Sequence, residues 1–374
     1  MPLSAIREQQ QTAFREFARE EVEPHAEAWD RDETIPLRSI DAFAGKGWFG
    51  TLIPAEHGGL GQDAVAFGLL NEEIGGACSS LRSVLTVHSM VSYAVCRWGS
   101  DTLRRQWLPR LATGEVIGAF CLSEETSGND AGALATTAVH DGETFRLTGT
   151  KKWITYGQRS DVYLVFAACD GKPAAFLVER NLPGVEVVPV RGMSGTRASM
   201  VAELHLHDVA VPASSLVGRV GFGIAAVATS ALDIGRYSVA WGCVGILAAA
   251  LRTSLQHAHD RTSFGVRIGE HQLVQRMVAD MATAHSAARL LCVEAGELKD
   301  AGDPRTVHAT WTAKYFASCQ AFRAAADAVQ ILGARGCLEG HTANRLLRDS
   351  KVMEIIEGST QLQQIYLAQA ASTS

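Results

Sequence analysis

The sequence predicts an α+β fold, in which a helical N-terminal domain is followed by a small antiparallel β domain and then by a helical bundle. Three observations indicate this order: apolar residues recur at helical spacing near the start, alternate with polar residues in the middle, and form long helical stripes at the end. A length of 374 residues suits two or three domains. We therefore expect domains at residues 1–118, 119–220 and 221–374.

The first domain is predicted to be helical because apolar residues, among them Phe14, Phe17 and Val22, recur with charged residues between them. The sequence PAEHGGLG at residues 54–61 is rich in helix breakers and indicates a loop. Further helices are expected over residues 81–98 and 101–111.

The middle domain is predicted to be antiparallel because residues 201–206 alternate apolar and polar side chains, as in a strand with one buried face. Asp141 and Gly142 form a dipeptide that is typical of a hairpin turn. The expected strands cover residues 136–138, 145–147, 162–168, 174–179, 185–190 and 201–206.

The third domain is predicted to be an antiparallel helical bundle because two long apolar stripes follow each other with a short join. We expect the methionine and aromatic side chains in these stripes to belong to the core. The first stripe contains Leu273, Met277, Met281, Ala284, Ala288 and Leu291, and the second contains Trp311, Tyr315, Cys319, Phe322, Ala326 and Val329.

The composition argues against several classes of protein. The net charge is -6, and the absence of a dense Lys/Arg run argues against a nucleic-acid partner. Eight cysteines without a CxxC pair indicate buried thiols in a reducing cytoplasm, with no disulfide and no metal site. Residues 1–11 lack the apolar segment of a secretion signal, and the weakly polar run 239–251 is too short to span a membrane. We therefore expect a cytoplasmic protein without a membrane partner.

The sequence EIIEGSTQ at residues 354–361 places Glu357 directly before a glycine and two hydroxyl side chains. Glycine allows a ligand to approach the backbone closely, and the hydroxyls and the Gln amide can bind polar parts of a cofactor. If its carboxylate faces a closed pocket, Glu357 is a candidate general base. The alternative is a helix C-cap beside a solvated glutamate.

Two segments of the middle domain are candidates for contact with a ligand. The sequence FCLSEETSGNDAG at residues 120–132 can present hydroxyls and backbone N–H groups to a polar ring or a phosphate, or it is a plain polar loop. The sequence GTKKWIT at residues 149–155 offers the broad apolar face of Trp153, or it is an ordinary strand with a core tryptophan.

Two segments of the bundle are also candidates for contact with a ligand. Arg261 in the sequence RTSFG suits a phosphate, and the helix that opens after EHQL at residues 270–273 attracts anions; helix capping without a ligand is the alternative. The closely spaced glycines of QILGARG at residues 330–336 allow a nucleotide to approach, or they only end a helix in the left-handed conformation.

In this order and layout, the segments resemble the acyl-CoA dehydrogenase family of flavoproteins over about residues 5–370. The resemblance implies an N-terminal helical domain, a central antiparallel β barrel or sandwich, and a C-terminal four-helix bundle. It also implies that FAD lies between the β domain, the bundle and a neighbouring subunit of a homodimer or homotetramer.

The resemblance assigns Glu357 as the catalytic base. One branch of the family carries its base on the first bundle helix instead, at the position of Gly235 here, and this favours Glu357. Asp233, Arg236 and Gly358 match positions near the substrate. The residues that match cofactor contacts are Phe120, Leu122, Ser123, Gly128, Asn129, Trp153, Ile154, Thr155, Arg261, Phe264, His271, Gln272, Leu273, Gln330, Leu332, Gly333, Ser359, Thr360 and Gln361.

The implied reaction is dehydrogenation of an acyl thioester. The base removes the α proton while the β carbon delivers a hydride to flavin N5, and a backbone N–H of the base residue and a flavin ribityl hydroxyl stabilise the thioester oxygen. Exclusion of water would raise the pKa of the carboxyl and strengthen the base. The electrons would pass to an electron-transfer flavoprotein or to oxygen.

Two departures from the family pattern concern the substrate. Asn129 stands where CoA enzymes carry a serine that helps to hold the tether of the thioester. Trp241 is bulky and either shortens the acyl pocket or packs between helices. The helix start that contains Trp241 is similar to a branch in polyketide and peptide antibiotic pathways, which oxidises short polar acyl groups on an acyl carrier protein, such as the precursor of the methoxymalonyl extender unit.

The leading hypothesis is therefore an FAD enzyme that acts on a short acyl group held by an acyl carrier protein. Three alternatives stay open: a short-chain acyl-CoA dehydrogenase of fatty-acid or amino-acid catabolism, a flavin oxidase or monooxygenase on the same scaffold, and a non-catalytic assembly protein. The presence of Glu357, Arg261 and the segment 120–132 argues against the last of these.

Overall fold

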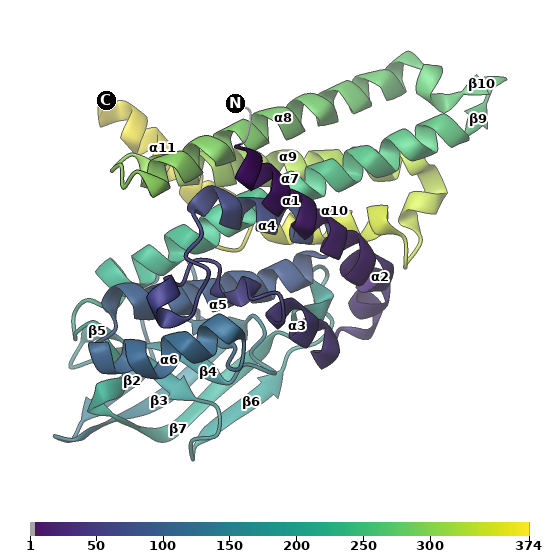
Figure 1. Ribbon diagram of the computed structural model, residues 1–374. Coiled ribbons are helices and arrows are strands. Elements are labelled where there is room, and N and C mark those ends of the chain that lie inside the picture. Colours follow the sequence, from purple (N-terminus) through teal and green to yellow (C-terminus); the bar gives the residue numbers. More distant parts are fainter. Residues whose placement is uncertain (1–3, 374) are drawn as a thin grey trace.

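The computed structural model describes residues 4–373 and places helices, a sheet and further helices in the predicted order (Figure 1). The α+β prediction is confirmed. The N-terminal helices are α1 (Ala5–Phe17), α2 (Glu23–Asp32), α3 (Leu37–Ala44), α4 (Ala64–Ala77), α5 (Ser79–Trp98) and α6 (Asp101–Thr113). The strands of the main sheet are β1 (Gly118–Cys121), β2 (Thr137–His140), β3 (Thr144–Ile154), β4 (Val162–Cys169), β5 (Lys172–Glu179), β6 (Val185–Pro189), β7 (Ala202–Pro212) and β8 (Leu216–Val217). The C-terminal elements are α7 (Thr229–Asp260), the hairpin β9 (Thr262–Ser263) and β10 (Val266–Arg267), α8 (Gln272–Asp300), α9 (Thr306–Leu332), α10 (Thr342–Met353) and α11 (Thr360–Thr373).

The N-terminal helices begin at residues that favour helix starts. Ser4 Oγ accepts from Arg7 N at 3.4 Å, and Asp63 Oδ1 accepts from Ala66 N at 2.7 Å at the start of α4. These side chains satisfy backbone donors that the first helical turn leaves unpaired. The helix α5 is almost wholly buried, because it lies between the sheet and α7 (Figure 1).

The main sheet has the strand order β6-β7-β3-β2-β4-β5-β8, with β1 also paired to β4. Most pairs are antiparallel as predicted, but β1 and β2 both run parallel to β4. An alternating pattern predicts a buried face and not the direction of a neighbour, so the sequence did not reveal these two pairings. In β7, Ala202, Leu204 and Leu206 are buried while Glu203 and His205 between them are only partly buried, as the alternation predicts.

The four helices α7, α8, α9 and α10 pack against one another as a bundle, and α11 lies against α9. By length and composition alone, the helical stretch Gly223–Asp260 could cross a membrane, yet 83% of its most apolar window is buried inside the protein. It therefore has the character of a core helix, and α7 is the central helix on which both helical regions pack.

Glycines allow α4 to approach α7 closely. A Cβ atom at Gly75 would lie 2.7 Å from the Cα of Gly242, and one at Gly76 would lie 2.8 Å from the oxygen of Gly245. Real Cβ contacts are longer than this, so the two backbones meet only because side chains are absent. This close contact fixes the position of α7, which carries several of the candidate site residues.

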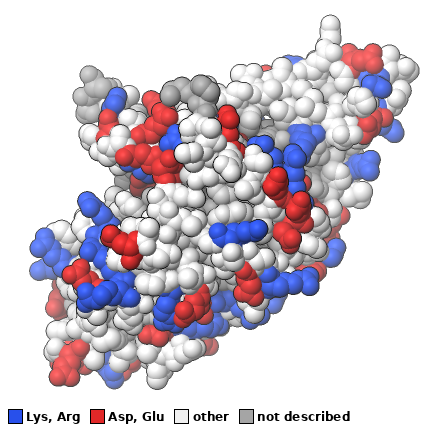
Figure 2. All heavy atoms as spheres, viewed as in Figure 1, with Lys and Arg blue, Asp and Glu red and all other residues white. Residues whose placement is uncertain are grey.

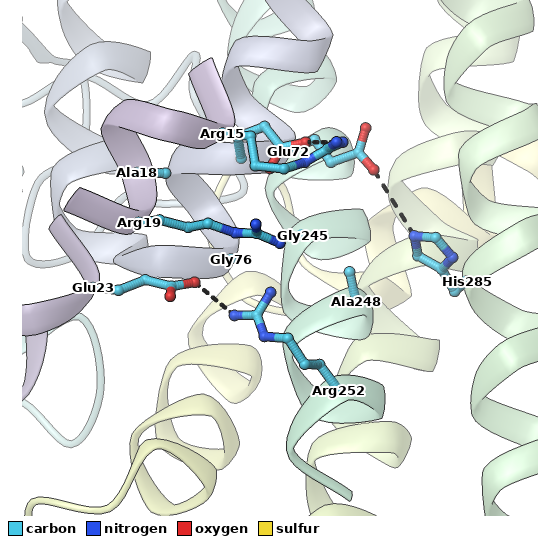
Figure 3. Close-up of a pocket in the computed structure, with 11 residues that line it drawn as sticks. Arg15, Ala18, Arg19, Glu23, Glu72, Gly76, Gly245, Ala248, Arg252 and His285 are labelled. Atoms are coloured by element: carbon cyan, nitrogen blue, oxygen red, sulfur yellow. Dashed lines mark hydrogen bonds and ion pairs between the residues drawn. The ribbon is translucent and has the colours of Figure 1, made fainter. Parts of the chain in front are cut away.

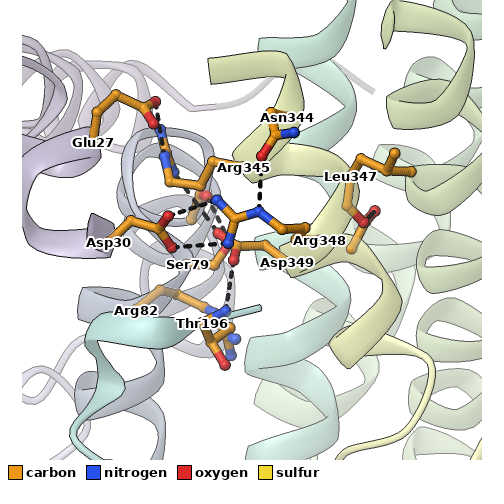
Figure 4. Close-up of polar contacts among 12 residues, drawn as sticks. Glu27, Asp30, Ser79, Arg82, Thr196, Asn344, Arg345, Leu347, Arg348 and Asp349 are labelled. Carbon is orange, nitrogen blue, oxygen red and sulfur yellow. Dashed lines mark hydrogen bonds and ion pairs between the residues drawn. The ribbon is translucent and has the colours of Figure 1, made fainter. Parts of the chain in front are cut away.

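A buried ionic network fixes α10 to the rest of the protein (Figure 4). Arg345 donates to Glu27 at 2.9 Å, and Arg348 donates to Asp30 at 2.5 Å, so α10 is held to α2. Asp349 Oδ1 accepts from Thr196 N of the β domain at 2.6 Å, although burial raises the pKa of this carboxyl. The network therefore positions the end of α10, which leads directly into the turn that contains the candidate base.

Candidate active site

Glu357 lies in a strained turn between α10 and α11. Its φ angle is 57° and that of Gly358 is 92°, and a left-handed backbone is uncommon for any residue except glycine. Thr360 closes the turn, because its N–H and its hydroxyl both donate to the carbonyl of Glu354, at 2.9 and 3.2 Å. Glu357 Oε2 is shielded from solvent, so the alternative of a solvated glutamate at a helix cap is wrong.

The carboxyl of Glu357 occupies space that Gly235 of α7 leaves free. A Cβ atom at Gly235 would lie 2.7 Å from the carboxyl carbon of Glu357 and 2.8 Å from Met90 Sδ. No side chain larger than hydrogen fits there without displacing the carboxyl. Gly235, the position at which the resemblance would place the base of another branch, therefore leaves room here for the carboxyl of the candidate base Glu357.

Two cations hold the backbone of this turn. Arg236 Nε of α7 donates to the carbonyl oxygen of Glu357 at 3.0 Å, and Lys314 Nζ of α9 donates to that of Gly358 at 2.9 Å. Gln363 Nε2 of α11 adds a second bond to Gly358 at 2.8 Å. The strained turn is thus fixed from three helices, which holds the Glu357 side chain in place.

The electrostatic surroundings suit a base. Burial raises the pKa of Glu357 to about 6, against the opposing effect of Arg236, Lys314 and Arg82. Burial also lowers the pKa of Lys314 to about 8. Oε2 of Glu357 has no hydrogen-bond partner in the described part of the chain, and neither does its backbone N–H. An unpaired carboxylate oxygen and an unpaired donor on one residue are free to act on a ligand.

The segment 120–132 lies beside residues 357–361 in space. Asn129 Nδ2 donates to Ser359 Oγ at 3.4 Å, which joins the two predicted cofactor segments. Gly128 and Asn129 are exposed, and Ser123 is partly buried. Phe120 is in β1, where its ring packs 5.0 Å from that of Phe166. The buried side chain of Leu122 leaves only its backbone for contact with a ligand.

Trp153 is not a core residue, although a strand with a core tryptophan was the simplest interpretation of its sequence. Its φ angle of 62° falls at an irregular point in the pairing of β3 with β7, and its side chain is 52% exposed. The left-handed backbone turns the ring out of the sheet, while Ile154 next to it is buried in the sheet core. Thr155 follows and is partly buried. The exposed ring offers an apolar face to a flat ligand.

The remaining predicted cofactor residues form a second group, which we call the distal set: Arg261, Phe264, His271, Gln272, Leu273, Gln330, Leu332 and Gly333. They lie at the far end of the bundle, where the β9–β10 hairpin projects (Figure 1). Arg236 and Arg261 are separated by 25 positions on or next to α7, which corresponds to about 37 Å along a helix. One chain therefore does not bring Arg261 of the distal set to Glu357.

Several groups of the distal set lack partners among the residues that the structure describes. Phe264 is 94% exposed and Leu273 is 73% exposed. His271 is at the start of α8, but its side chain makes no capping bond, and its Nε2 is shielded from solvent without a partner in the described residues. Gly333 ends α9 with φ 61° and ψ -142°, which is not the left-handed helical stop. An exposed aromatic ring, an orphaned imidazole nitrogen and an arginine fit a dinucleotide cofactor.

Asp233 and Trp241, which the sequence also placed near the substrate, have different surroundings. Asp233 forms an ion pair with Lys299 of α8, and its Oδ1 is buried without a partner in the described chain. Trp241 is fully buried: a Cβ atom at Gly68 of α4 would lie 2.7 Å from its Cδ1, and Arg289 of α8 lies 5.9 Å from the centre of its ring. Trp241 thus packs between helices, on a different face of α7 from Gly235.

The sequence interpretation missed Lys314 and a buried ion pair beneath the segment 120–132. Lys151 donates to Glu124 at 2.6 Å, and Glu124 also accepts from the N–H groups of Ala135 and Thr136, so the pair fixes this loop. Lys314 lies three residues after Trp311 and one before Tyr315, inside a predicted apolar stripe. A cation in such a stripe was the available signal.

A pocket of about 180 Å³ between α1, α4, α7 and α8 contains none of the predicted site residues (Figure 3). Most of its charged side chains are paired: Arg15 with Glu73, Arg252 with Glu23, and His285 with Glu72. Basic and acidic side chains are likewise interspersed over the face of the molecule in Figure 2. Arg19, which also lines the pocket, makes no ion pair with the residues drawn in Figure 3, but no acidic or nucleophilic side chain there is free to act on a substrate.

A helix–sheet–helix fold with a shielded carboxylate at Glu357 and an exposed ring at Trp153 is typical of the class of flavin-dependent dehydrogenases. Residues 5–115, 119–209 and 221–372 match the N-terminal, middle and C-terminal domains of acyl-CoA dehydrogenases. An acyl-CoA dehydrogenase of Bacillus subtilis (strain 168) is 36% identical over 360 residues, 95% of this chain and 94% of that protein. The mitochondrial short-chain specific acyl-CoA dehydrogenase of Mus musculus is 35% identical over 95% of this chain and 87% of its own.

Solved structures agree with these relatives. FkbI for biosynthesis of the methoxymalonyl extender unit of the Fk520 polyketide is 36% identical, with a TM-score of 0.90 over 98% of this chain and 99% of its own. A chain described with the electron transferring flavoprotein of Acidaminococcus fermentans is 33% identical, with a TM-score of 0.96 over 99% of both chains. A glutaryl-CoA dehydrogenase of Mycobacterium smegmatis in complex with FADH2 is 27% identical, with a TM-score of 0.94 over 100% of this chain and 96% of its own.

The chain belongs to the acyl-CoA dehydrogenase family. It is an FAD-dependent oxidoreductase that acts on the CH–CH group of an acyl thioester. The family prediction from the sequence, the fold class and the cofactor are thereby confirmed.

Proposed function

We propose that the protein dehydrogenates a short polar acyl group that is held as a thioester on an acyl carrier protein, with Glu357 as the base. The observation that carries this proposal is the carboxyl of Glu357, which is seated against Gly235 with Oε2 unpaired. A carboxylate that is buried, held by a fixed turn and raised in pKa to about 6 is suited to take a proton at neutral pH.

In the proposed reaction, different residues remove the proton, stabilise the thioester oxygen and hold these groups in position. Glu357 Oε2 takes the α proton, and its free backbone N–H donates to the thioester oxygen as negative charge develops there. Arg236 and Lys314 keep both groups in place by holding the carbonyls of Glu357 and Gly358. Bound FAD supplies the acceptor for the β hydride.

We assign FAD to two groups of residues that come from different subunits. The first group is Ser123, Gly128, Asn129, Trp153, Thr155 and Ser359 to Gln361 beside Glu357, and the second is the distal set. Each is incomplete in one chain, because about 37 Å of α7 separates them. The proposed assembly is therefore a homodimer or a homotetramer.

The choice of carrier rests on two observations. Asn129 donates to Ser359 at 3.4 Å, in the place where CoA enzymes of the family carry a serine for the substrate tether. The similarity to FkbI, at 36% identity over nearly the whole chain, favours a carrier protein. A similar chain is described with an electron transferring flavoprotein, and this supports such a protein as the electron acceptor.

The same short acyl groups, presented on CoA and on an acyl carrier protein, test the carrier. We expect anaerobic loss of the oxidised flavin absorbance to be faster with the carrier-protein thioesters. Fast bleaching by butyryl-CoA or isobutyryl-CoA would instead establish a short-chain acyl-CoA dehydrogenase, which the similarity to the mouse enzyme favours. Oxygen consumption in proportion to turnover would identify an oxidase.

A further inference from the structure

Arg82 of α5 is a buried cation without an acidic partner. Its side chain is 1% exposed, and its guanidinium donates to Thr86 Oγ1 at 2.9 Å, to Ser83 Oγ at 3.0 Å and to Met353 Sδ at 3.2 Å. Its Nε is buried without a partner, and no carboxylate among residues 4–373 lies within 4.0 Å of it. A thioether sulfur is a weak acceptor, and an unpaired buried charge is costly.

Two neighbouring arginines differ from Arg82 because each has a carboxylate partner. Arg345 and Arg348 lie close by in Figure 4, and each donates to a carboxylate, Glu27 and Asp30 respectively. Arg82 is drawn beside this network, but its partners are hydroxyls and a sulfur. Among residues 4–373, the fold thus supplies acids for the arginines that hold α10 and none for Arg82, so we expect the missing anion to come from a ligand.

A continuous row of contacts between α5 and α7 connects Arg82 with the base. At one end, Gly235 of α7 adjoins both Met90 and the carboxyl of Glu357. One turn along, Thr86 Oγ1 lies 2.6 Å from Ser238 Oγ. After another turn, Arg82 packs on Gly242, where a Cβ atom would lie 2.8 Å from its Cδ.

This row is short enough for a small substrate. Arg82 and Met90 are eight positions apart on α5, which corresponds to about 12 Å along the helix. The arginine side chain shortens this span further, and the carboxylate of Glu357 acts on the guanidinium electrostatically, raising its pKa against the lowering effect of burial. Met90 and Met353 flank the row, and methionine side chains rearrange readily around a ligand.

We propose that Arg82 binds a carboxylate at the far end of the acyl group, so that the substrate is a four- or five-carbon dicarboxylic acid with one end held as the thioester. This inference rests on the proposed function and names its substrate class. Glu357 takes the α hydrogen as a proton, the β hydrogen leaves as a hydride to the FAD of the enzyme, and an α,β double bond forms. The far carboxylate takes no part in the bond changes; it pairs with Arg82 and displaces the Met353 sulfur.

The test compares glutaryl-pantetheine with pentanoyl-pantetheine on the FAD-loaded full chain. The two acyl groups have the same number of carbons and differ in the carboxylate, and pantetheine is common to CoA and to carrier proteins. We expect kcat/KM for flavin bleaching to be about 100-fold higher with the glutaryl thioester, since loss of one partner of a buried charge pair has effects of this size. We expect Arg82→Gln to lose about 100-fold on glutaryl-pantetheine and to change pentanoyl-pantetheine by less than about threefold.

The control is Arg252→Gln, which removes an arginine from a surface ion pair with Glu23 and should change neither substrate. Arg82→Lys keeps the charge and should retain part of the preference. Equal rates for the two thioesters with the wild-type protein would overturn the inference, even if the Arg82 variants fail to fold. An equal loss on both thioesters in Arg82→Gln, with FAD content unchanged, would also overturn it. If no acyl thioester bleaches the flavin, the proposed function itself fails.

Discussion

The carboxyl of Glu357 and the Cα of Gly235 are in direct contact across two segments that are more than 100 residues apart in the sequence. The glycine provides the space, the turn at Glu357 and Gly358 supplies the direction, and burial raises the pKa of the carboxyl to about 6. Neither residue alone would indicate a base, but their contact places a shielded carboxylate against α7.

Gly235→Ala should abolish most activity without unfolding the protein. The new Cβ would lie 2.7 Å from the Glu357 carboxyl carbon, so the carboxyl must move, and small displacements of a catalytic group cost about 100-fold in rate. The measurement is anaerobic flavin bleaching together with FAD content. Gly45→Ala is the matched control, because Gly45 has a helical backbone and lies at the end of α3. Unchanged turnover in Gly235→Ala would show that the carboxyl is not seated here during the reaction.

Glu357→Gln should retain FAD and lose turnover by about 100- to 10,000-fold, the usual contribution of a general base. The amide keeps the volume of the side chain but cannot accept the α proton. Stopped-flow bleaching with the best substrate measures the loss, and the visible spectrum reports the bound flavin. Near-normal bleaching in this variant would remove Glu357 from the mechanism.

The same substitution should stabilise the protein at high pH. Burial raises the pKa of Glu357 from 4.5 to about 6, so the folded state binds this proton more tightly than the unfolded state. The stability that this group contributes is present below the unfolded pKa of 4.5 and is lost as the pH rises through about 6. Glu357→Gln removes this loss of stability at high pH, which amounts to about 2 kcal/mol in the free energy of unfolding.

Urea denaturation of the FAD-loaded protein at about pH 8 and about pH 5 measures the difference. We expect the variant to be more stable than the wild type at the higher pH and the gap to narrow at the lower pH. A gap that is independent of pH would mean that the carboxyl is not shifted in the folded protein.

The sequence was sufficient for the order of the elements and for naming Glu357 as the candidate base, and insufficient for what surrounds that residue. Helical and alternating periods identify which face is buried, so the stripes of α8 and α9 and the face of β7 could be predicted. The exposed ring of Trp153 could not, because the left-handed backbone at that residue follows from the irregular pairing of β3 with β7. Arg82 was also missed, although it is the only Asp, Glu, Lys or Arg between Ser79 and Cys96, because a lone charge does not reveal its partner.

Lys314→Met should move the acid limb of the pH profile to higher pH. The lysine charge lowers the pKa of Glu357, and its Nζ holds the Gly358 carbonyl at 2.9 Å. Without the charge the pKa of Glu357 rises, and because the rate requires the ionised carboxylate, kcat/KM falls off at a higher pH than in the wild type. The pH dependence of kcat/KM measures this effect. Lys351→Met, which removes an exposed lysine paired with Glu354, should leave the acid limb in place, and an unmoved limb in Lys314→Met would contradict the expectation.

Hybrid oligomers should show that the distal set serves the base of a neighbouring subunit. Arg261→Ala should lose FAD, although Arg261 is separated from Arg236 by about 37 Å of helix. If one site uses Glu357 of one subunit and Arg261 of another, a hybrid of Glu357→Gln with Arg261→Ala contains one intact site and one doubly altered site. The two variants, each inactive alone, should then give up to about half of wild-type activity per hybrid pair of sites when co-expressed with separate tags and purified through both. If both groups belonged to the same chain, every site in the hybrid would carry one defect, and the hybrid would be as inactive as its parents.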